Sequence, residues 1–162
     1  MDQKEIMKIV GMFEQILPKF PDGRIDYTES DAAAVILVFV KCKDEILLLK
    51  RSEKVSTHRG VWDVVAGYLD EIKPVKQKVL EELKEESGID ENDILSIHIR
   101  EGFKSVEKIK KWFVLPVLVE LKSKPDIKLD WEHTEYKWIK PEELEDLETV
   151  PNLAERWKNL HV

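Results

Sequence analysis

Residues 67–89 of the chain read GYLDEIKPVKQKVLEELKEESGI, and most of what the sequence predicts starts from this stretch. It predicts an α-helix over residues 74–87, because Pro74 suits the first helical position and Gly88 suits a left-handed C-terminal cap. An apolar stripe at helical spacing would face a core, and it consists of Val75, Val79 and Leu83. The helix is therefore expected to lie on a hydrophobic layer.

Three glutamates fall on one flank of this helix. At about 100° per residue, Glu82, Glu85 and Glu86 lie within an arc of roughly 100°. Like charges four residues apart destabilise a helix by about 0.2–0.5 kcal/mol per pair, and the helix dipole disfavours anions in the last turns. A divalent cation would offset this repulsion, because Mg²⁺ binds carboxylate oxygens together with water and phosphate. The cluster therefore predicts a metal site.

A solvated acidic face is the simpler explanation for an acidic run in a chain rich in Lys and Glu. Residues 142–146 form a second acidic run, EELED, which provides a comparison. That run follows Pro141 at a predicted helix start, where anions are stabilised, so it needs no metal. Only the glutamates of residues 81–86 stand where local helix electrostatics opposes them.

The composition indicates a single globular domain. The chain has 162 residues, of which 43% are hydrophobic, enough for one substantial core. Its longest apolar stretch, residues 32–40, is far shorter than the roughly 20 residues of a membrane-spanning helix. No secretory leader is apparent, and one cysteine, Cys42, allows no internal disulfide. We therefore expect a cytoplasmic protein that has no membrane partner.

The charge balance narrows the class of ligand. A net charge of −7 argues against duplex nucleic acid as a partner, since phosphate-backbone binding needs a basic surface. A small phosphate-bearing ligand remains compatible with this charge, provided that a metal or local cations receive it.

Patterns elsewhere in the chain predict a mixed sheet flanked by helices. Further helices are predicted at residues 4–17, 141–147 and 152–159. Strands are predicted at residues 32–41, 45–50, 61–65, 94–101, 110–121 and 136–139. The elements lack the regular alternation of a doubly wound fold. We expect an α/β (α+β) chain forming one globular unit, with an N-terminal helix and loop at residues 1–30 and the main domain at residues 31–162.

The stretch from residue 67 to residue 89 resembles the signature of the Nudix hydrolase family, G-x5-E-x7-R-E-U-x-E-E-x-G-U, in which U is aliphatic. The matching residues are Gly67, Glu82, Leu83, Glu85, Glu86, Gly88 and Ile89. Segments 46–51, 60–67, 132–139 and 141–144 are also similar to parts of that family. The resemblance implies a Nudix-like α/β/α sandwich with a mixed sheet, to which this chain adds an N-terminal helix.

Two positions of the signature carry reversed charges. The family has Glu and Arg where this chain has Lys73 and Glu81, and in the family those two residues form a salt bridge. We expect Lys73 and Glu81 to form a structural salt bridge of opposite polarity that ties the loop to the helix.

The resemblance implies a Mg²⁺-dependent hydrolysis, with Mn²⁺ as an alternative ion, of a diphosphate bond in a nucleoside diphosphate linked to another moiety. Nucleoside triphosphates and nucleotide sugars belong to this class. Carried over by position, the metal ligands are Glu82, Glu85, Glu86 and the Gly67 carbonyl. The candidate general bases are Glu82, taken first, and Glu132 from a late loop, taken second.

Two cations upstream of the signature are candidate substrate-binding residues. Arg51 lies at a strand end and Arg59 in a polar loop, where either could contact a substrate phosphate, although a solvated charge is the alternative at each position. The resemblance also leaves room for a homodimer, formed through sheet edges or the N-terminal segment.

Two other functions share the fold that the resemblance implies. The first is a catalytically weak nucleotide-binding or regulatory module, suggested by the changes at Lys73 and Glu81. The second is an isomerase of the isopentenyl-diphosphate type, which needs a catalytic cysteine, but the strand-like surroundings of Cys42 do not resemble such a site. The three glutamates favour the hydrolase.

Overall fold

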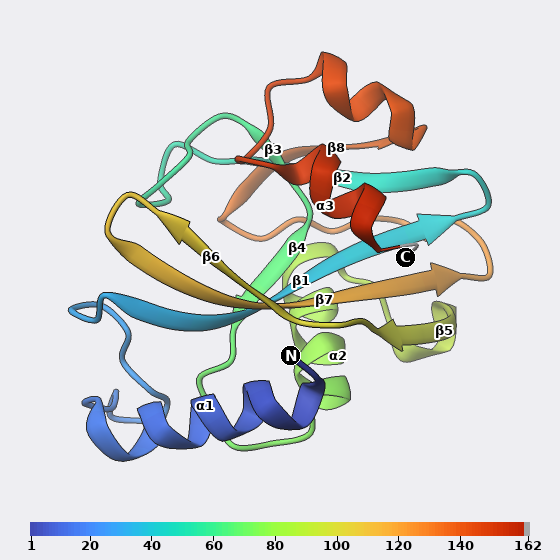
Figure 1. Ribbon diagram of the computed structural model, residues 1–162. Coiled ribbons are helices and arrows are strands. Elements are labelled where there is room, and N and C mark those ends of the chain that lie inside the picture. The colour runs from blue at the N-terminus through green and yellow to red at the C-terminus, as the bar shows by residue number, and fades with distance from the viewer. Residues whose placement is uncertain (161–162) are drawn as a thin grey trace.

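The computed structural model describes residues 1–160, whose strands form an eight-stranded mixed sheet with helices on both sides (Figure 1). The strands are β1 Ala32–Cys42, β2 Glu45–Arg51, β3 Trp62–Asp63, β4 Val65–Tyr68, β5 Ile94–Ile99, β6 Phe103–Glu107, β7 Lys110–Leu121 and β8 His133–Ile139. The α-helices are α1 Gln3–Ile16, α2 Val75–Ser87 and α3 Leu153–Asn159, and the 3₁₀ helices are η1 Glu91–Asp93 and η2 Pro141–Asp146.

Strand β1 lies at the centre of the sheet and has three partners. It runs parallel to β7 from Ala32 to Lys41, whereas the other strand pairs are antiparallel. Its middle residues pair with β4, where Ile36 lies opposite Gly67, and its last residues form the β1–β2 hairpin. The mixed sheet predicted from the sequence is confirmed, and β4 brings Gly67 beside the centre of the sheet.

Each face of the sheet carries its own hydrophobic layer, because β1 is buried on both sides. One layer joins the sheet to α1 and α2, and its helical members include Val10, Val79 and Leu83. The other layer joins the sheet to η2 and α3 through Leu144 and Leu153. The α/β/α arrangement is therefore confirmed, and α2 lies on the opposite face of the sheet from α3.

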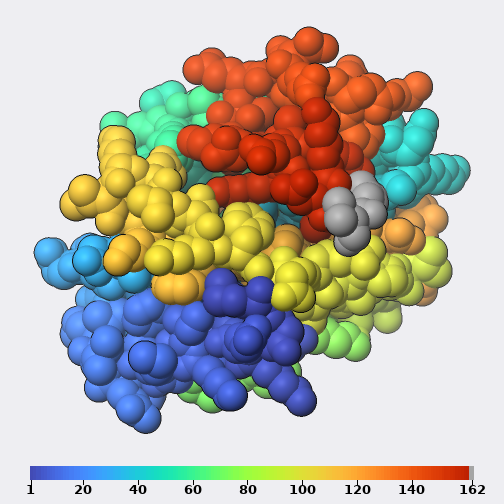
Figure 2. Space-filling model, in the orientation of Figure 1, coloured from blue at the N-terminus to red at the C-terminus, as the bar shows by residue number. Residues whose placement is uncertain are grey.

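Helix α1 is anchored at both its start and its apolar face. Asp2 caps the helix by accepting a hydrogen bond from the Glu5 N–H, while Ile6 and Phe13 pack into the core. The Met1 ammonium group donates to the Gly102 carbonyl at 3.0 Å. Figure 2 shows α1 in blue, below the edge formed by residues of β5 and β6. The predicted N-terminal helix is thus packed onto the main domain.

Several local features differ from the sequence-based expectations. The expected strand at residues 94–101 ends at Ile99, and a second strand, β6, pairs with the same edge of β7. Pro74 is the N-cap of α2 instead of its first helical residue, because its ψ of 135° is extended. The segment at 141–146 is a 3₁₀ helix. Within residues 1–160, no helix is long and apolar enough to cross a membrane.

Candidate active site

Helix α2 presents an acidic flank because its apolar stripe fixes its orientation. Val75, Val79 and Leu83 are fully buried against the sheet, as the sequence predicts. Gly88 ends the helix with a φ of 72°, and its N–H donates to the Lys84 carbonyl. Glycine adopts this left-handed conformation with less strain than residues that carry a Cβ, so the helix stops one residue after the acidic turns.

Glu86 is the most buried of the acidic side chains. It is 2% exposed, and its Oε2 atom has no hydrogen-bond partner. Its Oε1 atom lies 3.8 Å from His133 Nε2. Burial raises the pKa of Glu86 well above its ordinary value, and the neighbouring Glu82 carboxyl group raises it further. A buried carboxyl group with an unsatisfied oxygen is costly unless a ligand completes it.

Glu82 packs directly against Gly67 of β4. A Cβ atom placed on Gly67 would lie 2.4 Å from Glu82 Cδ, so a larger residue there would have to displace the Glu82 side chain. The close approach also brings the backbone of Gly67 next to the carboxylate. Burial is the largest cause that raises the pKa of Glu82, although the neighbouring Lys78 acts in the opposite direction.

Lys78 is a buried residue of this site that the sequence analysis missed. Its ammonium group lies 3.1 Å from Asp70 Oδ1 and 3.1 Å from Glu82 Oε1. Its side chain is only 8% exposed. Burial tends to lower the pKa of Lys78, but the two carboxylates outweigh this and the net shift is upward. In sequence, nothing separates Lys78 from the exposed lysines of the same helix.

The two remaining predicted acids lie differently around Glu82 and Glu86. Glu85 is exposed on the outer side of α2. Glu132 is half-buried in the loop before β8, and its backbone N–H donates to Asp130. Burial, followed by the charges of Asp130 and Glu82, raises the pKa of Glu132 to about 7. The late loop therefore brings a carboxyl group with a near-neutral pKa into the field of the α2 acids.

His133, at the start of β8, is buried beside the acids of α2. Its side chain is 2% exposed, and its Nδ1 atom lies 3.3 Å from Asp130 Oδ1. Burial lowers the pKa of His133. The ring lies between Asp130 and Glu86, and with a lowered pKa the imidazole is neutral at pH 7.

Lys73 and Glu81 form a direct ion pair. The Lys73 ammonium group donates to both carboxylate oxygens of Glu81, at 3.0 Å and 2.8 Å, and also lies 3.1 Å from Glu71 Oε1. The Lys73 hydrogen bond is the largest cause that lowers the pKa of Glu81. The loop after β4 is thereby tied to α2.

The two candidate substrate-binding arginines are both engaged with the protein. The Arg51 guanidinium lies 3.2 Å from Asp63 Oδ2 and donates to the carbonyls of Thr57 and His58. Arg59 donates to the Val55 carbonyl at 2.7 Å and is otherwise exposed. Arg51 thus holds the loop of residues 52–61, whereas Arg59 lies at the surface of that loop.

The residues at α2 suit a hard divalent cation. The donor set consists of carboxylate oxygens and the nearby Gly67 backbone, and the unpartnered Glu86 Oε2 offers a buried oxygen. Within residues 1–160, however, no three His, Cys, Asp or Glu side chains already stand together as a ready-made metal site. Lys78 contacts Glu82 Oε1, and Glu85 is exposed, so a metal would have to gather these ligands.

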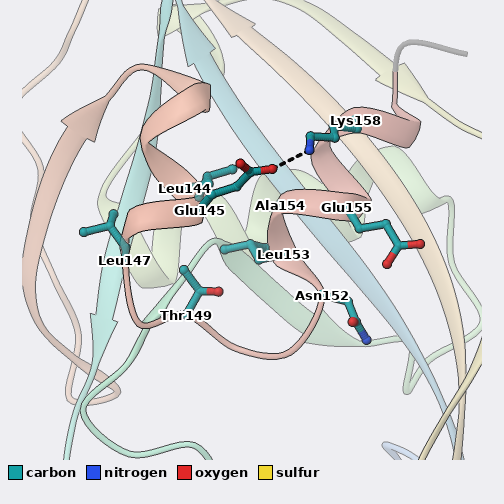
Figure 3. Close-up of a pocket in the computed structure, with 9 residues that line it drawn as sticks. All are labelled: Leu144, Glu145, Leu147, Thr149, Asn152, Leu153, Ala154, Glu155 and Lys158. Carbon is teal, nitrogen blue, oxygen red and sulfur yellow. Dashed lines mark hydrogen bonds and ion pairs between the residues drawn. The ribbon is translucent and has the colours of Figure 1, made fainter.

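The hollow drawn in Figure 3 is a separate feature. It has a volume of about 390 Å³ and lies between η2 and α3, where Lys158 forms an ion pair with Glu145 across it. Leu144 and Leu153 at its floor belong to the core layer on the opposite face of the sheet from α2. The hollow therefore contributes nothing to the acidic site.

Comparison with known proteins supports the family. The NUDIX domain model matches residues 29–159. The MutT protein from Methanosarcina mazei Go1 is similar in structure, with 28% identity over 81% of this chain and 96% of that one, and a TM-score of 0.64. An Ap4A hydrolase from C. elegans shares the fold at 23% identity, covering 80% of this chain and 94% of that one, with a TM-score of 0.60.

The protein DR0079 from Deinococcus radiodurans also shares the fold, at 17% identity over 91% of each chain and a TM-score of 0.68. No curated protein sequence matches the chain. Because the NUDIX model covers most of its length, the chain belongs to the Nudix family. It is a pyrophosphohydrolase of that family, a class that uses divalent metal ions and acts on small nucleotides.

Proposed function

We propose that the protein hydrolyses a diphosphate bond in a nucleoside diphosphate linked to another moiety, such as a nucleoside triphosphate or a nucleotide sugar, and that Mg²⁺ is its metal. Glu82, Glu85 and Glu86 would hold the ion, with the Gly67 carbonyl as a further ligand. The proposal depends on one observation: the Oε2 atom of Glu86 is buried and has no hydrogen-bond partner. A divalent cation satisfies that oxygen and stabilises the neighbouring carboxylates in their charged forms.

The bound metal would neutralise the diphosphate and stabilise the negative charge that develops on its oxygens. Water attacks one phosphorus, the bond from that phosphorus to the bridging oxygen breaks, and the bridging oxygen leaves with the other phosphate. The attacking water must lose a proton. Glu132 is suited to accept it, because it is half-buried in the field of the α2 acids and its pKa in the metal-free site is about 7.

Glu82 is the other candidate base, but its Oε1 atom is already bound to Lys78. A carboxylate oxygen that accepts from a buried ammonium group is a weaker proton acceptor, which favours Glu132. Arg59 is proposed as a contact for a substrate phosphate because its side chain is exposed, whereas Arg51 is engaged by Asp63. For Arg51 we propose a mainly positional role, through its contacts with Asp63 and the loop carbonyls. A homodimer and a cytoplasmic location stay predictions.

A panel of nucleotides tests the proposed reaction. It contains nucleoside triphosphates, nucleotide sugars, dinucleoside polyphosphates and ADP-ribose, each incubated with Mg²⁺ or with EDTA, and the products are identified by ³¹P NMR. We expect turnover of at least one compound, with Mg²⁺ only. Glu86→Gln and Glu85→Gln should each lower kcat at least about 100-fold, the scale for loss of a metal ligand. Glu142→Gln, an exposed acid on η2, is the control.

Nucleotide binding without turnover across the panel would overturn the hydrolase and indicate the regulatory module instead. Equal turnover in Mg²⁺ and EDTA would overturn the metal assignment.

A further inference from the structure

Lys78 stands out because lysine side chains are rarely buried. It leaves α2 one turn before Glu82, and its only charged contacts within residues 1–160 are Asp70 and Glu82, at 3.1 Å each. Both partners are also largely buried, with side-chain exposures of 7% and 12%. A buried ion pair is weak evidence for a stabilising role, since apolar residues of similar size often do as well.

Glu82 is confined from two sides. Gly67 of β4 lies so close to its carboxyl group that a Cβ there would overlap Cδ, and Lys78 holds its Oε1 atom. The ion pair with Lys78 therefore favours one orientation of the carboxylate about its last torsion. One of its oxygens is committed to the lysine, and Oε2 is the oxygen left for a further ligand.

We propose that Lys78 is a positioning residue for the metal site: its ammonium group, anchored by Asp70, locks the orientation of the Glu82 carboxylate so that only Oε2 is offered to the cation. This inference rests on the proposed function. Lys78 also places a fixed positive charge beside the ion, so it weakens metal binding while it improves the geometry of the bound state. Affinity and turnover should then change in opposite directions when Lys78 is replaced.

A purely structural lysine has a different signature. If Lys78 only tied the loop at Asp70 to α2, its loss would reduce stability and disturb the site, and metal affinity would fall or stay unchanged. The two roles are therefore separated by the sign of the change in metal affinity, which does not depend on knowing the substrate.

The test compares wild type, Lys78→Met and Lys76→Met. Lys76 is an exposed lysine on the same helix and serves as the matched control. Mn²⁺ alone is titrated into each metal-free protein by calorimetry, and kcat and KM are measured on the panel compound that wild type hydrolyses fastest. Lys78→Met leaves Asp70 with only its 3.7 Å contact to Arg24 and should lower stability. The double variant Lys78→Met with Asp70→Asn also removes this buried carboxylate and is expected to keep the fold intact.

We expect Mn²⁺ to bind Lys78→Met and the double variant about tenfold more tightly, because a like charge near the ion is gone. Their kcat should fall roughly 10- to 100-fold, with a smaller change in KM, because the ligand is no longer oriented. Lys76→Met should match wild type in both measurements. Unchanged or weaker Mn²⁺ binding, or a kcat within twofold of the control, overturns the role of Lys78. Wild type that binds no Mn²⁺ overturns the proposed function itself.

Discussion

The Lys73 ammonium group donates to both carboxylate oxygens of Glu81, at 3.0 Å and 2.8 Å. The family signature places an ion pair of the opposite polarity at these positions, so the chain keeps the pair with its charges exchanged. Glu81 directly precedes Glu82, and the pair therefore fixes the loop after β4 against the turn of α2 that carries the first candidate ligand.

Reversing one charge of this pair should destabilise the protein. Lys73→Glu would place three carboxylates together, since Glu71 also contacts Lys73, and we expect a loss of about 1 to 2 kcal/mol in the free energy of unfolding. Adding Glu81→Arg should recover most of it. Urea denaturation measures both, with Lys76→Glu as an exposed control on α2. A double variant no more stable than the single one would show that the pair does not tie loop to helix.

Two glycine substitutions should have opposite effects. Gly67→Ala would bring a methyl group within 2.4 Å of Glu82 Cδ, which displaces the carboxylate; we expect lower stability and at least a tenfold loss of kcat. Gly11→Ala, inside α1 and with no atom within 4 Å of the added carbon, should stabilise by about 0.5–1 kcal/mol. Thermal unfolding and turnover assays measure both. Full activity in Gly67→Ala would mean that the Glu82 contact is not needed.

Glu86→Gln should stabilise the metal-free protein while it abolishes turnover. The folded-state pKa of Glu86 is raised, so between its ordinary value of 4.5 and the raised value the folded state binds more protons than the unfolded state. Stability contributed by this group is therefore lost as pH rises. The gain from Glu86→Gln should therefore grow as pH rises from 5 to 8.

Urea unfolding in EDTA at pH 5 and pH 8 measures this gain, and Glu85→Gln controls for the loss of one carboxylate at an exposed position. The prediction is contradicted if Glu86→Gln is less stable than wild type at pH 8 without metal. The buried carboxylate would then not destabilise the metal-free protein.

The pH dependence of turnover should identify the base. Because a base works only when deprotonated, kcat/KM should fall as pH drops through the pKa of Glu132, which is about 7 in the metal-free site and lower beside a cation. Glu132→Gln should remove this acid limb and reduce kcat roughly 100-fold or more. Glu135→Gln, an exposed acid on β8 paired with Lys50, is the control. Persistence of the limb in Glu132→Gln would assign the base elsewhere.

The sequence predicted the acidic helix well because its signals are local. Pro74, Gly88 and the stripe of Val75, Val79 and Leu83 fix the helix within one residue. Periodicity also gave the long central strands. Periodicity did not predict β6. Residues 103–107 include charged and polar side chains and are largely exposed, and their pairing with β7 is a tertiary contact.

Burial explains why other site residues were missed. Lys78, Asp70 and His133 are ordinary polar residues in sequence, and only the approach of β4 and the loop before β8 buries them beside the glutamates. Arg51 was expected as a candidate phosphate contact, and its partner Asp63 lies on β3, paired with β2. Ion pairs between segments that are distant in sequence leave no periodic pattern, so these contacts can be identified only from the three-dimensional structure.

Crystals soaked in Mn²⁺ test the central claim most directly, because anomalous scattering locates the ion without reference to any substrate. The predicted result is an anomalous peak bounded by the carboxylates of Glu82, Glu85 and Glu86, with Glu86 Oε2 among its contacts and the peak absent in Glu86→Gln. Well-ordered side chains at α2 with no peak between them, at an Mn²⁺ concentration that supports turnover in solution, would contradict it.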